Sequence, residues 1–523
     1  MNLLARLKPL LSQPREMVLQ GYSHDTFWRR SIMLFGAIYA VTLIAAGASF
    51  AIYGPNVLMP AAAILAVLSL LVVWVLPETG RAPVVAMRRF FLCFLISLLF
   101  WPDYLAFDFP GLPWITALRL FAVPLGATFL ICLSVSADFR ATLKKITQES
   151  RITNYALIAF TVLAGLSVVY SRNPGDSANS FAIAVTYWIL IFYVSVYVLR
   201  NIHYVYLLTL IIWLFALVAC GVAFWEWRNQ GVPWAGHIPS FLAVGDPVVA
   251  KILSGSARST TNVYRLQGKF TTPLGLAEFL AFSTPFVLYH LVYSTNLFVK
   301  ILALSTLPVV FFIILLTDSR LGAAGFFIAF LLALASWAVT RWYKNKESLF
   351  GPLLTLSFPL VLLAFMIATL VVGRLRNIIW GTGAQSFSTQ AREAQWDSGI
   401  PKLLVQPWGY GLGQGGSVLG YRNLAGGLTI DSHYLAVLLE IGILGFAVYS
   451  VIFLSSLAYG TISLLNARTK EHMLIVPFMS LIAIFVVEKA VFAQLENHPL
   501  VFISLGAVTA ICWQIRSDNK VVA

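Results

Sequence analysis

Long apolar segments recur through almost the whole of this sequence, and they constrain its fold more than any other feature. A helix needs about 20 apolar residues to cross the hydrocarbon core of a membrane. Of the 523 residues, 59% are hydrophobic and 11% are charged, whereas a soluble domain carries roughly 25% charged residues. The sequence therefore predicts an all-α polytopic integral membrane protein with about 14 transmembrane helices. The predicted spans are, to within a few residues, about 31–53, 57–76, 90–106, 115–134, 153–170, 178–199, 204–225, 273–293, 298–316, 321–339, 351–373, 434–459, 473–492 and 500–513.

The distribution of Lys and Arg predicts how these spans are oriented. Basic residues concentrate in every second loop, for example at Arg29 and Arg30 and at Lys144 and Lys145. The short alternate loops, such as 101–114, hold almost none. Since cytoplasmic loops are enriched in Lys and Arg, both termini are predicted to be cytoplasmic. This topology also accounts for the net charge of +14 without a nucleic-acid partner.

Two polar segments, 226–272 and 374–432, are too long to be tight connections between helices. Both are rich in Trp, Tyr and Gly, and long loops in a compact bundle are usually functional or disordered. We expect them to be ordered, functional periplasmic loops. The predicted division is a cytoplasmic N-terminal segment (1–30), N-terminal transmembrane helices (31–225), a first periplasmic loop (226–272), central transmembrane helices (273–373), a second periplasmic loop with a candidate catalytic motif (374–432), C-terminal transmembrane helices (433–514) and a cytoplasmic tail (515–523).

The cysteines and the N-terminal sequence bear on metal binding, cofactors and targeting. The four cysteines lie inside apolar segments, and none is spaced for metal binding or redox chemistry. We expect no metal and no nucleotide cofactor, because the sequence has neither a His/Cys cluster nor an Asp-x-Asp motif in a cytoplasmic loop. The first 30 residues are polar and basic, so we expect no cleavable signal peptide.

Four polar motifs fall on the predicted outer face. They are Arg265–Pro273, Thr317–Gly322, Arg392–Gly413 and Asp431–Gly445. The first, second and third contribute one arginine each: Arg265, Arg320 and Arg392. Guanidinium groups bind phosphate oxygens in pairs and stay ionised, so three of them at one surface could form a cradle for a pyrophosphate. The alternative is that they anchor the helices at the interface or pair with local carboxylates.

The fourth motif begins a helix and carries three candidate catalytic groups. Asp431 and Ser432 are good N-cap residues, so we expect the helix to start there. His433 is a candidate general base because its imidazole titrates near neutrality; the alternative is a solvated interface residue. Glu440 lies two turns further on, roughly on the face of His433, and is either functional or a structural hydrogen-bond partner of the facing loop.

Several other polar residues have no clear place in the sequence pattern. Glu488 and Lys489 fall within a predicted span, where their charges can neutralise each other. Arg119 also falls within a span, and we could not assign it to an end. The turn Glu496–Pro499 is interpreted as an ordinary turn, with membership of the site as the alternative. Trp396 and its neighbours are interface residues or platforms for a sugar.

In order and topology, the four motifs resemble the O-antigen ligase/polymerase superfamily of bacterial surface-polysaccharide enzymes over roughly residues 265–445. Arg265–Pro273 is similar to the arginine–glycine–proline stretch of that family, and Thr317–Gly322 to its Ser-Arg-Gly turn. The segment Arg392–Gly413 is similar to its Arg…Trp…Pro-x-Gly-x-Gly run. Each motif alone is weak, but the ordered set is fairly specific.

This resemblance implies a bundle like that of the C-type glycosyltransferases in the bacterial inner membrane, active at the periplasmic face in exopolysaccharide or O-antigen biosynthesis. It implies a metal-independent glycosyltransferase without a cofactor. The expected partners are an undecaprenyl-pyrophosphate-linked oligosaccharide, a glycan acceptor, the lipid bilayer and a chain-length regulator. By resemblance, Arg265 and Arg392, with Arg320 as a third candidate, bind the pyrophosphate. The residues expected to support the glycan or the loop are Tyr434, Trp396, Gly411 and Gly413.

The sequence departs from the ligase pattern at the expected base. Ligases tend to have His-Asn-x-Tyr-Leu with a Glu six residues after the Tyr, and anchoring on Tyr434 and Glu440 puts Asp431 in the place of that His. His433 is displaced by two positions, or about 200° around an ideal helix. Either Asp431 is the base, or an unwound helix start lets His433 reach the site.

Three functions remain open from the sequence. The leading hypothesis is a polymerase that transfers a growing chain onto the next lipid-linked repeat, because an Asp at position 431 looks more like the polymerising members. The second is a ligase that moves polymer to lipid A core, or a protein O-oligosaccharyltransferase. The third, of a different class, is a transporter or flippase for the lipid-linked glycan, which should show repeat symmetry and broken helices near mid-membrane.

Overall fold

Helices dominate the part of the chain that the structure describes, and each of the predicted apolar segments overlaps one or more of them there. The computed structural model describes residues 25–53, 58–109, 114–257, 263–344, 346–347, 349–371, 386–422 and 427–522. Within these ranges, nine helices are long and apolar enough to cross a membrane, and three shorter apolar helices lie at Met33–Ser49, Ile64–Trp74 and His472–Glu488. The all-α polytopic class is confirmed, whereas the predicted total of spans stays a prediction.

The chain divides into two compact units. The smaller unit comprises the chain up to Leu92 and residues Ala106–Ala141. Its elements are α3 (Asp25–Tyr53), α4 (Leu58–Trp74), the first part of α5 (Val84–Phe100), the strands β1 (Ala106–Phe107) and β2 (Ile115–Thr116), α6 (Ala117–Val135) and the start of α7 (Ala137–Thr147). The two strands are antiparallel, with Ala106 opposite Thr116.

The smaller unit also places Arg119, which the sequence left unassigned. Arg119 lies in the first turn of α6, where its backbone N–H is bound by the N-cap hydroxyl of Thr116. Its guanidinium donates to the carbonyl of Trp114 at 2.7 Å. It therefore marks the end of a helix and not its apolar middle.

The larger unit comprises Cys93–Leu105 and Thr142–Ala523 and contains every motif that the sequence singled out. Its elements are η2 (Gln148–Ser150), α8 (Arg151–Val169), α9 (Pro174–Ala184), the π-helical turn η3 (Val185–Ile189), α10 (Leu190–Val198), α11 (Ile202–Asn229), η4 (Ser240–Leu242), α12 (Pro247–Leu253), β3 (Ser256–Ala257), β4 (Tyr264–Arg265), α13 (Pro273–Tyr293), α14 (Leu297–Leu316), α15 (Arg320–Lys344), α16 (Phe350–Val371), α18 (Ser386–Val405), α19 (Gly415–Leu419), α20 (His433–Leu465), η5 (His472–Leu474), α21 (Ile475–Glu488) and α22 (His498–Val522).

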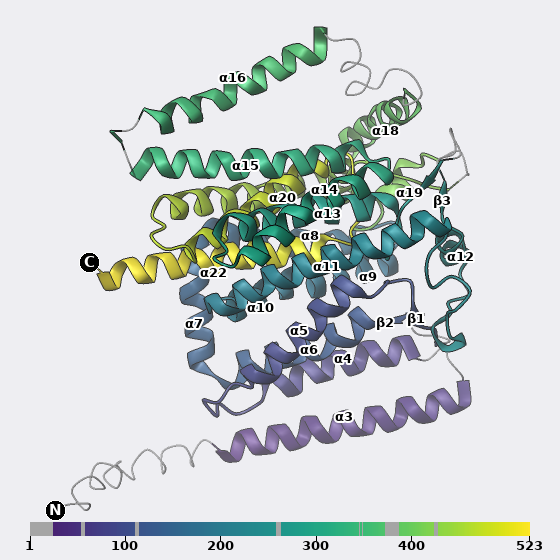
Figure 1. The fold of residues 1–523 in the computed structure, drawn as a ribbon. Coiled ribbons are helices and arrows are strands. Elements are labelled where there is room, and N and C mark those ends of the chain that lie inside the picture. The colour runs from purple at the N-terminus through teal and green to yellow at the C-terminus, as the bar shows by residue number, and fades with distance from the viewer. Residues whose placement is uncertain are drawn as a thin grey trace, which may run out of the picture. The chain divides into compact units, whose positions relative to one another are not determined.

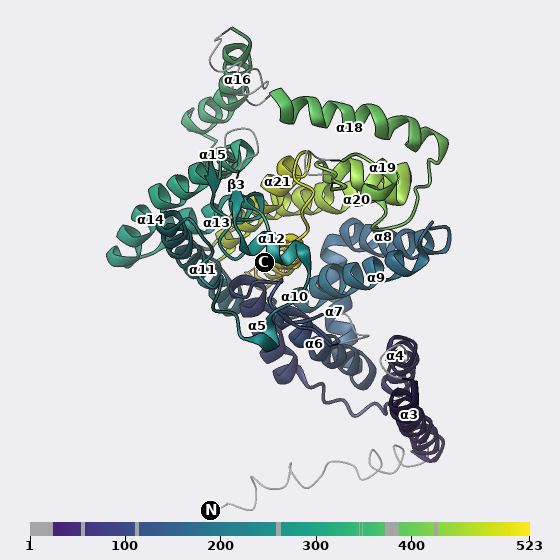
Figure 2. The same cartoon turned by 90° about the vertical axis from the view of Figure 1, so that its right-hand side faces the viewer.

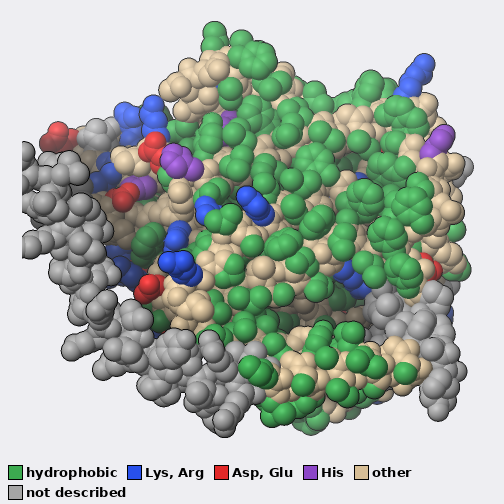
Figure 3. Space-filling model, turned by 90° about the horizontal axis from the view of Figure 1, so that it is seen from below, with side chains coloured by type: hydrophobic (Ala, Val, Ile, Leu, Met, Phe, Trp, Pro, Cys, Tyr) green, Lys and Arg blue, Asp and Glu red, His purple; other side chains and the backbone are tan. Residues whose placement is uncertain are grey.

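Two helices form the centre of the larger unit. Side chains of α13 are buried almost without interruption from Pro273 to His290, and α22 is buried over most of its apolar length. Both pack against α21, and α22 also contacts α10 and α20. A helix that is apolar on all sides belongs in such a core. By contrast, the face in Figure 3 is covered mainly by hydrophobic side chains, as expected of a surface in contact with lipid.

Neither long loop is structureless. The first starts as a continuation of α11, which runs to Asn229 before the chain turns, and then contains α12 and the hairpin β3–β4. The predicted boundary at Trp225 is thus four residues early, because the helix continues past its apolar part. The second loop contains α18 and α19; residues 374–385 and 423–426 of it lie outside the described residues. Figure 1 shows α12, β3, α18 and α19 at the same end of the larger unit's helices.

Candidate functional site

The candidate site lies at the start of α20. Ser432 is the N-cap, and its side chain accepts a hydrogen bond from the N–H of Leu435. His433 is the first helical residue, and its N–H donates to the carbonyl of Lys489 at 3.1 Å. Tyr434 donates its hydroxyl to the carbonyl of Val486. The predicted helix start is correct, and two adjacent residues fasten it to the end of α21.

A cavity of about 280 Å³ lies beside this helix start. His433 and Glu440 both line it from α20, since residues seven apart lie on one face of a helix. Trp188 of the π-helical turn, Gly413 of the second loop and Leu495 complete its wall. The structure therefore brings two of the three predicted catalytic candidates to one cavity.

His433 is buried and faces a second histidine. Its Nε2 atom lies 3.0 Å from the hydroxyl of Tyr449 and 3.3 Å from Nε2 of His498. The His498 ring in turn stacks on Trp188, with 5.1 Å between centroids. The turn Glu496–Pro499 thus reaches the candidate site, which was the less favoured of the two interpretations from sequence.

The third catalytic candidate, Asp431, is held by α18. The Gln395 side chain donates from Nε2 to the Asp431 carboxylate at 3.1 Å and accepts the Asp431 backbone N–H at 2.9 Å. Arg392 lies one turn before Gln395 on the same face of α18. Its Nε atom is buried and has no hydrogen-bond partner among the described residues. Figure 2 shows α18 next to α19 and α20, which it contacts.

The charges at Arg392 and Asp431 influence each other. Burial lowers the pKa of Arg392 from its ordinary value, and the nearby Asp431 carboxylate opposes this shift. A half-buried guanidinium with an unsatisfied donor beside a carboxylate can bind a further anionic oxygen. This is the arrangement expected of a phosphate-binding arginine next to a base.

Arg265 and Arg320 lie together at the turn between α14 and α15, away from the lining of the 280 Å³ cavity. The Nε atom of Arg265 donates to the carbonyl of Thr317 at 2.9 Å, so the first motif lies against the turn of the second. Arg320 is the first residue of α15, directly after that turn. Among the described residues, the lining of the 280 Å³ cavity includes no arginine. Convergence of all three arginines on one pocket therefore stays a prediction.

Glu226 is a structural residue of the site region that the sequence interpretation missed. Its buried carboxylate accepts the N–H of Gly268 at 2.7 Å, the N–H of Gln267 at 3.2 Å and the hydroxyl of Tyr264 at 2.8 Å. It thereby fixes the backbone directly after Arg265. The available signal was a carboxylate at the end of an apolar segment, but the predicted span ended one residue earlier.

The glycines of the second loop allow it to insert into a break in α20. Gly442 has φ 77° and ψ −175°, which interrupts the helix. Gly409, Gly411 and Gly413 have φ of 91°, 108° and 80°, values that favour glycine. Three backbone hydrogen bonds connect loop and break: Tyr410 N–H to Leu439 O at 2.8 Å, Gly411 N–H to Glu440 O at 3.0 Å, and Ile443 N–H to Pro407 O at 2.9 Å.

Glu440 and Trp396 support this loop. The Glu440 carboxylate accepts the N–H of Gly415 at 3.2 Å, which agrees with the structural alternative considered from sequence. Trp396 packs against a buried cluster that includes Tyr410 and Leu435. Gly411 and Gly413 pass close to Ser171 and Ser180, where a side chain on either glycine would collide. The loop is therefore fixed to α8, α9 and α20 by close backbone packing.

A buried ion pair lies below the site, and it differs from the predicted one. Lys489 pairs with Glu278 of α13 at 2.6 Å, with both side chains fully buried, and not with its neighbour Glu488. Adjacent residues near a helix end point about 100° apart, so Lys489 faces α13 where Glu488 does not. Asn497 donates to the second oxygen of Glu278 at 2.9 Å.

Within the described ranges, no three His, Cys, Asp or Glu side chains are grouped closely enough to hold a metal ion.

Comparison with known proteins agrees with the resemblance. The O-antigen ligase family model matches residues 304–450, from α14 to α20. The matched segment includes Arg320, Arg392, Asp431, His433 and Glu440, whereas Arg265 lies before it. No curated protein matches the chain. The matched segment thus contains three of the four motifs. The match supports membership of the O-antigen ligase-like superfamily and, together with the apolar helices of the described residues, an O-antigen ligase/polymerase type of function in a multi-pass membrane protein.

Proposed function

We propose that the chain is a polysaccharide polymerase of the bacterial inner membrane. It transfers a growing glycan from its undecaprenyl-pyrophosphate carrier onto the next lipid-linked repeat at the periplasmic face. The observation that carries this proposal is the juxtaposition of Arg392 with Asp431. Gln395 holds Asp431 just before the start of α20. Arg392 is a cation for the leaving group, and Asp431 is a base for the acceptor.

The proposed reaction is a single displacement with inversion. Asp431 takes the proton of the acceptor hydroxyl, whose oxygen attacks the anomeric carbon of the donor. The bond from that carbon to the pyrophosphate oxygen breaks, and the pyrophosphate leaves on its lipid. Arg392 stabilises the charge that develops on the leaving oxygen, while Arg265 and Arg320 bind the rest of the pyrophosphate.

Asp431 is preferred over His433 as the base because of the surroundings of each group. The Asp431 carboxylate is half-buried and lies beside Arg392. His433 is only 4% exposed, and its Nε2 faces Tyr449 and His498. We assign His433 the role of positioning the helix start and the cavity wall, together with Glu440.

The test is to replace Arg392 with Ala and, separately, Asp431 with Asn in a strain that lacks the chromosomal copy. Gel analysis of the glycan should show single repeats in place of polymer. Asp397→Asn is the matched control, because Asp397 is an exposed carboxylate on the same helix as Arg392. Polymer of normal length from both site variants would reject the proposal.

The second candidate is a ligase that acts on lipid A core, or a protein O-oligosaccharyltransferase. The description of the matching family model, O-antigen ligase, favours it. The same gels separate the two reactions. Loss of a ligase leaves full-length polymer on the lipid carrier, whereas loss of a polymerase leaves single repeats.

A transporter or flippase is less well supported. A broken helix near mid-membrane would suit a transport site, and α20 is interrupted at Gly442. However, backbone groups of Pro407–Gly411 fill this break through hydrogen bonds. The interruption therefore anchors a loop and leaves no room there for a transported group.

A further inference from the structure

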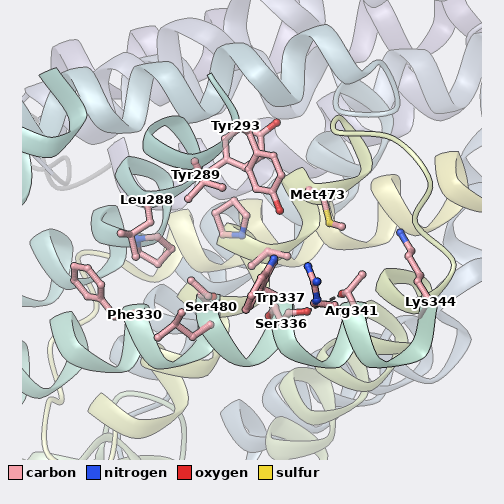
Figure 4. Close-up of a pocket in the computed structure, with 17 residues that line it drawn as sticks. Leu288, Tyr289, Tyr293, Phe330, Ser336, Trp337, Arg341, Lys344, Met473 and Ser480 are labelled. Atoms are coloured by element: carbon pink, nitrogen blue, oxygen red, sulfur yellow. Dashed lines mark hydrogen bonds between the residues drawn. The ribbon is translucent and has the colours of Figure 1, made fainter. Parts of the chain in front are cut away.

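A second cavity lies among α13, α15 and α21 and has no part in the proposed reaction. It encloses about 570 Å³, within the usual size range of ligand pockets. Leu288, Phe330 and Met473 contribute to its apolar walls, and Arg341 and Lys344 lie at one end (Figure 4). It is thus an apolar cavity with a basic end.

The basic end lies far from the candidate site. Arg320 begins α15 at the end of the larger unit's helices that carries the candidate site, and Arg341 follows 21 residues later on the same helix. At a rise of 1.5 Å per residue, this places the two about 30 Å apart. A membrane core is also about 30 Å thick, so the second cavity opens near the opposite membrane surface, the cytoplasmic one in the proposed topology.

The charged residues of the cavity are suited to an anion. Arg341 and Lys344 lie one helical turn apart, and the described lining residues include no Asp or Glu. The Arg341 guanidinium lies over the rings of Trp337 and Phe350, at 5.6 and 5.8 Å from their centroids. Lys344 donates to the carbonyl of Ala467.

We propose that this cavity binds one anionic glycerophospholipid of the surrounding bilayer leaflet. An acyl chain occupies the apolar part between α13, α15 and α21, and the phosphate binds Arg341 and Lys344. Basic pockets between transmembrane helices are suited to anionic headgroups. A small soluble anion would leave the apolar walls without a partner, so charge and shape together favour a lipid.

The experiment measures lipid retention by the full-length protein. The purified chain is stripped of lipid in neutral detergent, and phosphatidylglycerol or phosphatidylcholine is added at equal concentration before native mass spectrometry. We expect one phosphatidylglycerol per chain and little phosphatidylcholine. Because one basic residue near the membrane surface contributes about fivefold to the binding of anionic lipid, the double variant R341Q/K344Q should bind phosphatidylglycerol about 30-fold more weakly. Lys300→Gln, a basic residue on α14 outside the cavity, should leave binding unchanged.

A second pair of variants tests the apolar part with both charges in place. Ala333 lines the cavity, so Ala333→Phe should exclude the acyl chain and abolish retention. Ala335→Phe, on the same helix but outside the lining, should not. The proposal is overturned if R341Q/K344Q or Ala333→Phe binds like the wild type, if phosphatidylcholine binds equally well, or if excess inorganic phosphate displaces the lipid.

Discussion

The side-chain amide of Gln395 binds Asp431 at two points, the carboxylate and the backbone N–H. Gln395 is 1% exposed, so these contacts are shielded from water. Because the amide holds both the carboxylate and the backbone just before the α20 N-cap, it sets where the proposed base points. Gln395 lies one turn from Arg392, so α18 both carries the proposed cation and positions the proposed base.

Replacing Gln395 with Ala should lower glycan transfer about 10- to 100-fold, since a displaced base loses its alignment with the acceptor. The measurement is the amount of polymer made in the complemented deletion strain, normalised to protein in the membrane. Gln390→Ala is the control, because Gln390 is exposed on the same helix. Equal polymer from both variants would show that the amide does not position Asp431.

The ion pair between Lys489 and Glu278 should be needed for stability. Lys489→Met leaves the Glu278 carboxylate buried without its cation, and breaking such a pair costs about 3–5 kcal/mol. The double variant E278Q/K489M removes both charges and should recover much of this loss. Thermal unfolding in detergent, followed by tryptophan fluorescence, measures both effects.

Comparison of the two single variants with the double variant is a double-mutant cycle, and one result would contradict the prediction. If the losses of Lys489→Met and Glu278→Gln simply add in the double variant, the two charges do not interact. Lys470→Met provides the baseline, because Lys470 is exposed in the turn before α21. Its unfolding temperature should match that of the wild type.

Much of the fold followed from the length of the apolar segments. A span of about 20 apolar residues predicts a helix almost without reference to its neighbours, so even the start of α20 at His433 was anticipated from its cap. Helix ends were less well predicted. The end of α11 contains Glu226, which contacts a loop about 40 residues later, and no local pattern encodes these contacts.

The sequence predicted only those parts of the site that depend on local helix geometry. His433 and Glu440 share a cavity because helical spacing puts them on one face. The contacts of Gln395 with Asp431 and of His498 with His433 join segments 36 and 65 residues apart. Such contacts arise from packing in three dimensions, so no single-sequence pattern could predict them.

Stability should fall with rising pH because of Glu496. Burial raises the pKa of this carboxyl to about 7, although hydrogen bonds from Thr271 and the charge of Lys269 act in the opposite direction. Between roughly pH 4.5 and 7, the folded state holds a proton that the unfolded state has lost, so stability falls as pH rises through this window, by about 3 kcal/mol at most.

Glu496→Gln should remove this dependence, because the amide cannot ionise but can still accept the hydrogen bonds from Thr271. The unfolding temperature of the variant should vary less between pH 5 and 8 than that of the wild type. Glu347→Gln changes an exposed carboxylate and should leave the profile as it was. Parallel profiles for Glu496→Gln and the wild type would contradict the assignment.

Gly442 should be the least replaceable glycine of the loop and helix junction. Its φ of 77° with ψ of −175° lies in a region that is essentially restricted to glycine, and a Cβ there would overlap the carbonyl oxygen of Pro407. Gly442→Ala should therefore destabilise the protein by about 1–3 kcal/mol through backbone strain alone, and the overlap with Pro407 adds to this. It should also weaken the hydrogen bonds between the loop and the break in α20. Gly221→Ala is the matched control, since Gly221 lies within α11 with open space around it and alanine is the better helix former. A protease accessibility assay on membranes should show faster cleavage within 406–414 for Gly442→Ala alone; unchanged cleavage would mean that the loop is held without the break in α20.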